Sequence, residues 1–231
     1  PDGRHAFPLE PRVQGRFARI ATAETFLLRP ARPADRVSAL PDDRAALRRR
    51  LRERRRALPA AARIAGAEAL AGRLLALPGL PAEGYVAGYW AMDGEIGLHA
   101  WQLHLPPSLV YCLPVLGADQ RLRFAPWRPG DALATNRYGI PEPDAAATGL
   151  LDANALALVV MPLVGFDPDC HRLGMGGGWY DRSFAFRRPQ ATPPLLVGAG
   201  FDEQETEPLA LADWDVVPDA ICTPTRTLHS P

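Results

Sequence analysis

The sequence contains no lysine, so all 26 of its basic residues are arginine. This absence excludes the P-loop class of phosphate site, because the motif G-x-x-x-x-G-K-[ST] needs a lysine after its glycines. Arginine stays charged and offers a planar fork of N–H donors to an anion. Fixed positive charge at a phosphate must therefore come from arginine in this chain.

Cysteine is also scarce: Cys112, Cys170 and Cys222 are widely spaced, and the chain has no C-x-x-C pair. Such an odd set indicates reduced thiols rather than a disulfide framework or a zinc site. No apolar run approaches the length of a membrane span. The formal net charge of +0 argues against bulk binding of nucleic acid. We therefore expect a cytoplasmic protein that binds neither membrane nor nucleic acid.

The charge is unevenly distributed along the 231 residues. Residues 1–60 hold fifteen arginines against seven acidic residues, whereas residues 201–219 hold seven acidic residues and no basic one. The first forty residues are rich in proline and arginine and show no clear period. We expect a poorly ordered N-terminal extension over residues 1–40 and one catalytic domain over residues 41–231, as a monomer or a weak dimer.

The hydrophobic pattern predicts helices alternating with strands. Two helices are expected near the start, over residues 44–58 and 60–77, each followed by a proline. Further helices are expected over residues 96–105, 179–188 and 203–212, and strands over residues 85–90, 109–114, 122–127, 156–164, 195–201 and 217–223. This alternation predicts an α/β fold, layered α/β/α, with a central, mostly parallel sheet and two N-terminal helices.

A glycine-rich loop is the most informative motif: residues 172–182 read Arg-Leu-Gly-Met-Gly-Gly-Gly-Trp-Tyr-Asp-Arg. It follows an apolar run and precedes an expected helix. Glycine allows close backbone approach, and a helix N-terminus offers N–H donors to a phosphate. The dinucleotide fingerprint G-x-G-x-x-G fails in both registers, because its third glycine falls on Trp179 or Asp181. The alternative is a flexible turn without a ligand.

The first expected helix carries a stripe of arginines at i, i+4 spacing, made of Arg44, Arg48, Arg52 and then Arg55 or Arg56. This stripe suits a clamp on a polyphosphate, because one arginine side chain can donate hydrogen bonds to two phosphate oxygens at once. A solvated basic face remains the alternative.

Acidic residues follow several expected elements. Asp93 and Glu95 come after the expected strand 85–90, where α/β folds bind ligands, and could accept hydrogen bonds from a heterocycle edge. Asp181 follows the glycine loop and Asp215 lies in the acidic segment; two such carboxylates suit magnesium beside a phosphate. A simple turn explains Asp93 and Glu95 equally well, and residues such as Asp181 and Asp215, taken alone, are more often helix caps or surface residues. His171 adjoins the loop with no obvious aspartate or serine partner, so Ser-His-Asp catalysis is not supported.

Six motifs that stand in family order over about residues 42–225 resemble the 5-formyltetrahydrofolate cyclo-ligases, also called 5,10-methenyltetrahydrofolate synthetases. The hallmark R-x-G-x-G-x-G-[YF]-Y-D stands here as Arg172-Leu-Gly-Met-Gly-Gly-Gly-Trp-Tyr-Asp181. The other five motifs are the strand 159–167, the helix pattern 44–52 and the segments 92–96, 139–143 and 215–223.

The resemblance implies a ligase of one-carbon metabolism that uses ATP and Mg²⁺. Its substrate is 5-formyltetrahydrofolate, with or without a polyglutamate tail, and its products are 5,10-methenyltetrahydrofolate, ADP and phosphate. In this reaction ATP phosphorylates the formyl oxygen, N10 attacks the formyl carbon and phosphate leaves. The protein's part is mainly to position the reactants and neutralise charge on the moving phosphoryl group.

The resemblance also implies roles for individual residues. Arg172 and Tyr180 match catalytic positions, and Asp181 and Asp215 match magnesium positions. The positions that match folate contacts are Trp90, Glu95 and Tyr138. Those that match nucleotide contacts are Arg44, Arg48, Arg172, Leu173, Gly174, Met175, Gly176, Gly177, Gly178, Trp179 and Tyr180.

Departures from the family pattern concern the same loop and helix. Trp179 stands where tyrosine or phenylalanine is usual, and Arg44 stands where lysine is common. Met175 and Gly177 are uncharged where some relatives are basic, which puts more phosphate contact on the arginines. The alternative function is a non-catalytic or repurposed nucleotide-binding module on the same fold. Such a module would not need Glu95.

Overall fold

The computed structural model describes residues 41–144, 149–190 and 192–231, without the side chains of residues 41 and 42. The extension predicted over residues 1–40 lies outside the described residues, so the domain boundary near residue 40 stays a prediction. Among the helices of the described ranges, none combines the length and apolar character that crossing a membrane requires.

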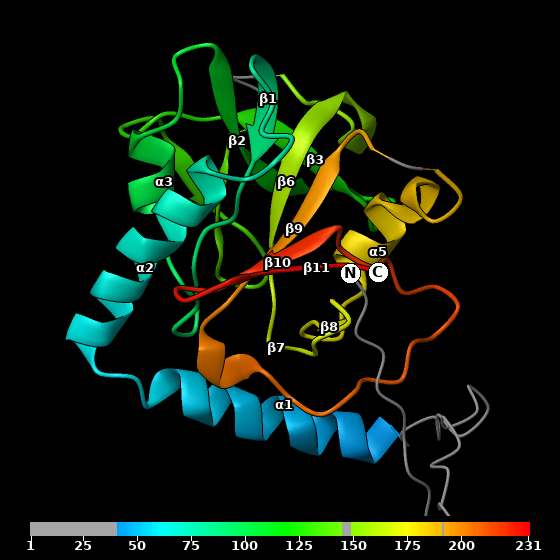
Figure 1. Ribbon diagram of the computed structural model, residues 1–231. Coiled ribbons are helices and arrows are strands. Elements are labelled where there is room, and N and C mark those ends of the chain that lie inside the picture. The colour runs from blue at the N-terminus through cyan, green and yellow to red at the C-terminus, as the bar shows by residue number, and fades with distance from the viewer. Residues whose placement is uncertain (1–40, 145–148, 191) are drawn as a thin grey trace, which may run out of the picture. The chain divides into compact units, whose positions relative to one another are not determined.

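The centre of the fold is a seven-stranded sheet with the order β11-β10-β9-β6-β1-β2-β3 (Figure 1). Neighbouring strands from β10 to β2 are parallel, and the edge strands β3 and β11 pair antiparallel. This confirms the predicted α/β class with a mostly parallel sheet. The strands are β1 (Gly84–Ala87), β2 (Leu109–Leu116), β3 (Leu122–Pro126), β6 (Leu156–Pro162), β9 (Leu195–Ala199), β10 (Ala220–Cys222) and β11 (Thr227–His229).

Helices cover both faces of the sheet (Figure 1). On one face α2 (Ala60–Leu75) and α3 (His99–Leu103) pack over a core that includes Leu158 and Val160 of β6. On the other face α5 (Trp179–Ser183) and the 3₁₀ turn η3 (Ala185–Arg187) lie beside the cluster that includes Val159 and Met161. Successive residues of a strand point to opposite faces, so a central strand must be apolar throughout. The layered arrangement follows from this pattern.

The first helix, α1 (Pro41–Arg56), runs along the end of the sheet where the parallel strands finish, next to β7 (Gly165–Phe166) and β8 (Arg172–Leu173) in Figure 1. Its fully buried Leu51 packs with Val164, Leu173 and Leu209. The helix is thus anchored by one apolar stripe, while Arg48, Arg52 and Arg55 contact the loops that follow the strands.

The prediction of a helix over residues 203–212 is wrong, because only the 3₁₀ turn η4 (Asp202–Gln204) forms there. Pro208 has no N–H to donate and cannot sit inside a helix. The backbone instead bonds to other segments: the Thr206 N–H donates to the Phe166 carbonyl oxygen, and the Leu209 N–H donates to Asp167. The sequence patterns did not predict the hairpin of β4 (Leu133–Thr135) and β5 (Pro141–Pro143), the hairpin of β7 and β8, the 3₁₀ turn η2 (Ala153–Ala155) or the edge strand β11.

Candidate active site

The candidate site lies where the order of the sheet reverses. The chain leaves β1 toward β2 on one side, and β6 later pairs with β1 on the other side. Loops at the carboxyl ends of two such neighbouring strands diverge and leave a crevice, which is where open α/β sheets bind ligands. Residues 88–98 follow β1 and carry the predicted folate acid. Residues 163–178 follow β6 and end in the glycine loop.

The glycine loop begins after the β7–β8 hairpin and leads into α5. Gly176 has φ 95° and Gly178 has φ 64°, a left-handed conformation that favours glycine. A Cβ at Gly178 would lie 2.7 Å from Nη1 of Arg182, whose other Nη donates to the Gly177 carbonyl oxygen. The helix expected over residues 179–188 splits into α5, with five residues, and η3. A helix dipole this short adds little, so a phosphate here depends on loop amides and arginines.

In the first half of the α1 arginine stripe, Arg48 contacts this loop and Arg44 contacts the acidic segment that contains Asp215. Arg48 Nε donates to the Gly174 carbonyl oxygen at 2.8 Å. Arg44 Nη2 lies 3.4 Å from Asp215 Oδ2 and 3.2 Å from the Ala210 carbonyl oxygen. Burial lowers the pKa of Arg48, and the positive charge of nearby Arg44 lowers it further. The negative charge of Asp215 acts in the opposite direction. Positive charge is therefore concentrated beside the loop, as a phosphate site requires.

Arg172 is paired with Asp181 through its Nη2 across the loop. The side chain of Arg172 is only 7% exposed. Its Nε is buried and has no hydrogen-bond partner among the described residues. A buried donor without an acceptor costs about 1–3 kcal/mol, which is tolerated mainly where a ligand can supply the acceptor. The environment of Arg172 is therefore suited to binding an anion in the crevice.

The two predicted magnesium ligands lie on neighbouring segments. Asp181 Oδ1 accepts the Val216 N–H at 3.2 Å, and Asp215 Oδ2 accepts the Ala212 N–H at 2.9 Å. In the described part of the chain, Asp181 Oδ2 and Asp215 Oδ1 accept no hydrogen bond, whereas the other oxygen of each carboxylate does. Within the same residues, no three His, Cys, Asp or Glu side chains gather as a metal site. The pair fits Mg²⁺, which usually takes one or two carboxylates together with phosphate and water.

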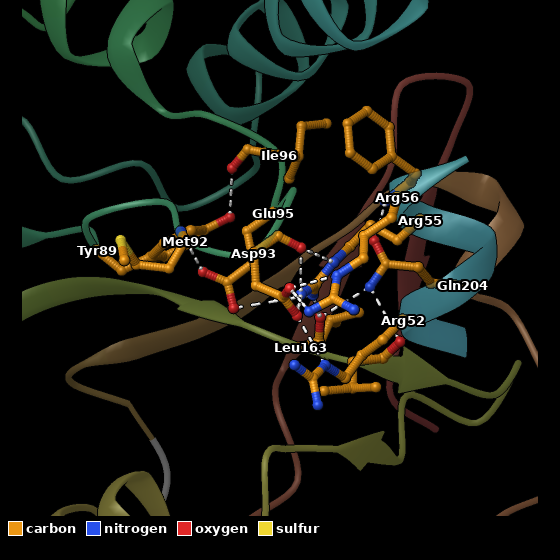
Figure 2. Close-up of polar contacts among 12 residues, drawn as sticks. Arg52, Arg55, Arg56, Tyr89, Met92, Asp93, Glu95, Ile96, Leu163 and Gln204 are labelled. Atoms are coloured by element: carbon orange, nitrogen blue, oxygen red, sulfur yellow. Dashed lines mark hydrogen bonds and ion pairs between the residues drawn. The ribbon is translucent and has the colours of Figure 1, made fainter. Parts of the chain in front are cut away.

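The predicted folate acid, Glu95, closes a tight turn after β1 (Figure 2). Its Oε2 accepts the Met92 N–H at 3.0 Å, and its side chain is 12% exposed. Burial raises the pKa of Glu95, opposed first by the Met92 hydrogen bond and then by the charge of Arg55. The Glu95 charge also contributes to the raised pKa of Tyr180, after burial of that phenol, so the two predicted site residues are electrostatic neighbours.

The second half of the arginine stripe converges on Asp93 (Figure 2). Arg52 Nε donates to Asp93 Oδ2 at 2.7 Å, Arg55 Nη2 donates to the same oxygen at 3.0 Å, and Arg56 pairs with Oδ1. Burial would raise the pKa of Asp93, but hydrogen bonds from Arg52 and Arg56 lower it below the ordinary value. The stripe predicted as one clamp is therefore divided among the glycine loop, the acidic segment with Asp215 and the turn after β1.

The aromatic residues of the prediction are only partly brought together. The rings of Tyr138 and Trp179 meet edge to face at 6.3 Å, and the guanidinium of Arg137 lies over both, at 5.2 and 5.4 Å. Among the ring contacts of the described residues, Trp90 meets Trp127, at 5.8 Å, rather than another predicted site residue. Sequence reasoning did not single out Arg137, although it precedes Tyr138.

The sequence interpretation of His171 was wrong, because the structure gives it an aspartate partner. His171 Nδ1 lies 2.8 Å from Oδ2 of the fully buried Asp167. The same carboxylate accepts the backbone N–H groups of His171, Asp169 and Leu209. Asp167 therefore organises the turn that leads into the glycine loop. The four-residue spacing within Asp167-Pro-Asp-Cys-His171 could have indicated this pair.

A sequence model of the 5-formyltetrahydrofolate cyclo-ligase family matches residues 41–224. The 5-formyltetrahydrofolate cyclo-ligase of Escherichia coli K12 is 34% identical over 180 residues, which cover 76% of this chain and 97% of that protein. The protein of the same name from Haemophilus influenzae is 36% identical over 135 residues, or 57% of this chain and 71% of the relative.

Solved structures agree on the fold. The 5,10-methenyltetrahydrofolate synthetase of Aquifex aeolicus superposes with a TM-score of 0.68 at 24% identity, covering 80% of this chain and 92% of that one. The synthetase of Mycoplasma pneumoniae gives 0.61 at 21% identity, covering 79% and 99%. From the family match and the relatives together, the chain belongs to the 5-formyltetrahydrofolate cyclo-ligase family, enzymes of one-carbon metabolism whose ligase chemistry implies the use of a nucleotide.

Proposed function

We propose that this protein converts 5-formyltetrahydrofolate to 5,10-methenyltetrahydrofolate with ATP and Mg²⁺, releasing ADP and phosphate. One observation carries the proposal: the arginine-lined glycine loop and the buried Glu95 meet at the same switch point of the sheet, with Tyr180 near both. A nucleotide-binding module would need only the first of these features. The family of the chain supports the same substrate.

When bound, ATP supplies a γ-phosphoryl group to the formyl oxygen; N10 then bonds to the formyl carbon and loses its proton as phosphate departs with that oxygen. The chain's own residues hold the reactants and balance charge. Arg44, Arg48 and Arg172 supply fixed positive charge to the phosphates. Tyr180 stacks on Phe184 with 6.3 Å between ring centroids, which supports it as a rigid wall of the site.

The amides of the loop complete the nucleotide site in this proposal. Leu173 is buried, so it contributes through its backbone, whereas Met175 is 55% exposed and lies at the outer side of the loop. The flexible glycines Gly174, Gly176, Gly177 and Gly178 let the backbone approach the phosphates closely. Trp179 lies between the guanidinium groups of Arg137 and Arg182, with both about 5.5 Å or less from its ring.

Asp181 and Asp215 would hold the magnesium ion through Oδ2 of Asp181 and Oδ1 of Asp215. The metal would neutralise charge on the phosphates beside the arginines. Asp181 and Asp215 are also tied to Arg172 and Arg44, so the acids and the phosphate-binding arginines form one charge-balanced group.

Folate would be bound by Glu95 and by the aromatic residues Trp90 and Tyr138. A carboxylate accepts two hydrogen bonds from the amidine-like edge of a pterin ring. Tyr138 is 56% exposed, so part of its ring is open to a ligand, although the Arg137 guanidinium lies over it. We extend the proposal to folates with a polyglutamate tail and to reaction in the cytoplasm, where the three free cysteines stay reduced.

The decisive experiment is an absorbance assay for 5,10-methenyltetrahydrofolate formed from 5-formyltetrahydrofolate, with ATP and Mg²⁺ added or omitted. Product that requires all three components supports the proposal. Tight ATP binding with no product from this folate would instead favour the nucleotide-binding module. A Glu95→Gln protein run in parallel serves as the control for contaminating activity, because a host enzyme would contaminate both preparations equally.

A further inference from the structure

Arg55 occupies an unusual position for an arginine: its side chain is fully buried, with no exposed surface. A guanidinium offers five N–H donors and keeps its charge, so burial requires partners on several sides. Nε and Nη2 both donate to the Asp93 carbonyl oxygen, at 3.2 and 2.9 Å, and Nη2 also reaches Asp93 Oδ2. Nη1 donates to the Leu163 carbonyl oxygen at 3.3 Å.

The remaining side of this guanidinium faces Glu95, with Nη1 3.8 Å from Oε1 (Figure 2). That distance makes an ion pair without a direct hydrogen bond. The Glu95 carboxylate is therefore held by the Met92 N–H on one oxygen and by the charge of Arg55 near the other. Arg55 also joins the turn after β1 to the end of β6, the two segments that form the crevice.

We propose that Arg55 is a positioning residue, whose buried charge keeps the Glu95 carboxylate ionised and oriented for the folate without touching the folate itself. This inference rests on the proposed function, because Glu95 is taken as the folate-binding acid. A buried carboxylate favours its neutral form, and a neutral carboxyl offers one donor where the folate edge needs acceptors. The cationic neighbour offsets that preference.

Other groups face Glu95 as well and enter any pH dependence. The charged or titratable neighbours are Arg52 and Arg55 from α1, Asp93 from the same turn, Tyr89 from the segment after β1, and Tyr180 from α5. Arg52 is 33% exposed and is bound to Asp93, so its charge at Glu95 is partly screened and partly balanced. Arg55 is the cation that burial leaves least screened.

The test is a double-mutant cycle that joins Arg55→Met with Glu95→Gln, measured on folate KM between pH 5.5 and 8.5. Methionine keeps the length of the side chain and removes its charge. If Arg55 acts through Glu95, Arg55→Met raises folate KM by up to about tenfold at the acidic end of this range, and the defect shrinks as the pH rises. In the Glu95→Gln background, the same change has little further effect. Equal, pH-independent losses in both backgrounds would overturn the proposal and leave Arg55 as a structural clamp.

Two variants guard against a folding defect. Arg55→Lys keeps the charge, and we expect its pH profile to lie near that of the wild type. If Arg55→Met does not fold, Arg55→Gln, which removes the charge but keeps hydrogen-bond donors, takes its place in the cycle. Arg54→Met alters an exposed arginine of the same helix and should change nothing. Nucleotide affinity is measured on every variant and should stay constant, whereas a collapsed crevice would lower it.

A readout independent of turnover separates this proposal from the proposed function. In protein carrying ¹³C-labelled glutamate, the Glu95 carboxyl resonance is identified by its loss in Glu95→Gln. We expect the titration midpoint to rise by about one pH unit in Arg55→Met, a tenfold change in the proton equilibrium. An unchanged midpoint would contradict the role of Arg55, even if the enzyme is active. A shifted midpoint in a protein that makes no methenyl product would contradict only the proposed function.

Discussion

Arg48 and Gly174 are joined by a 2.8 Å hydrogen bond from Nε to the carbonyl oxygen, although they are 126 residues apart. This contact uses the edge of the guanidinium that carries Nε and leaves the Nη groups beside the glycine loop. A Cβ at Gly176 would lie 3.5 Å from Cζ of Arg48, so the loop passes directly over the guanidinium. The relationship holds the Arg48 guanidinium in one orientation beside the loop, as the proposed phosphate contact requires.

We therefore expect Arg48→Ala to cost far more activity than Arg50→Ala. Loss of a charge-assisted phosphate contact should cost about 1.5–3 kcal/mol, on the order of ten- to a hundred-fold in kcat/KM. Arg50 is exposed on the same helix and serves as the matched control. Steady-state kinetics at varied ATP measure both variants. Similar losses in the two would mean that the stripe acts only as a solvated basic face.

Asp181→Asn should raise the Mg²⁺ concentration needed for half-maximal turnover by about tenfold or more, because one of two carboxylate ligands is lost. The same change weakens the pair with Arg172. A Mg²⁺ titration of the rate separates the two effects, since a broken ion pair alone lowers turnover at every metal concentration. Asp213→Asn, at an exposed aspartate near Asp215, is the control. A half-saturating metal concentration equal to that of the wild type would remove Asp181 from the metal site.

Glu95→Gln should impair use of 5-formyltetrahydrofolate while leaving ATP binding nearly intact. The amide replaces one acceptor with a donor, and a mismatched buried group costs about 1–3 kcal/mol, or roughly tenfold or more in folate kcat/KM. Exposed Glu83 provides the control Glu83→Gln. If ATP affinity falls as much as folate efficiency, Glu95 instead supports the whole crevice.

The pH dependence of folate KM tests the charge of Glu95 separately. Burial raises the pKa of Glu95, so its carboxylate becomes protonated at a higher pH than an exposed glutamate does. An ionised Glu95 binds the folate edge, so folate KM in the wild type should rise as the pH falls through this raised pKa. Glu95→Gln cannot titrate, and its folate KM should stay flat over that range. Parallel pH profiles in the two proteins would show that another group controls the dependence.

Two glycines of α2 offer a test of packing. A methyl group at Gly72 would meet nothing within 4 Å, whereas one at Gly66 would lie 3.0 Å from the Phe201 ring and 3.2 Å from Pro224. Gly72→Ala should raise the free energy of unfolding by about 0.5–1 kcal/mol through helix propensity alone. Gly66→Ala gains the same propensity but crowds the core, and should be less stable than Gly72→Ala. Urea unfolding compares them, and equal stabilities would show that the Gly66 site relaxes freely.

Local patterns were enough to predict much of this protein from its sequence. The continuous apolar run at residues 156–164 is typical of a strand covered on both faces, and most of it forms β6 at the centre of the parallel sheet. The spacing of the arginines predicted a helix that carries them along one face, and α1 is that helix. The glycine loop and the family motifs indicated the site because such residues are needed wherever the backbone approaches a phosphate.

Only the tertiary structure decided how those residues are used. Arg44 and Arg48 differ little from Arg52 and Arg55 in the sequence. Yet Arg44 pairs with Asp215 and Arg48 binds the glycine loop, while Arg52 and Arg55 hold Asp93. The split arises because α1 crosses the loops that follow both β1 and β6, and helix periodicity carries no information about what lies opposite. The burial of Arg55 has the same origin: its charge is tolerated only because carbonyl and carboxylate oxygens from two distant segments converge on it, and that convergence exists only in the folded chain.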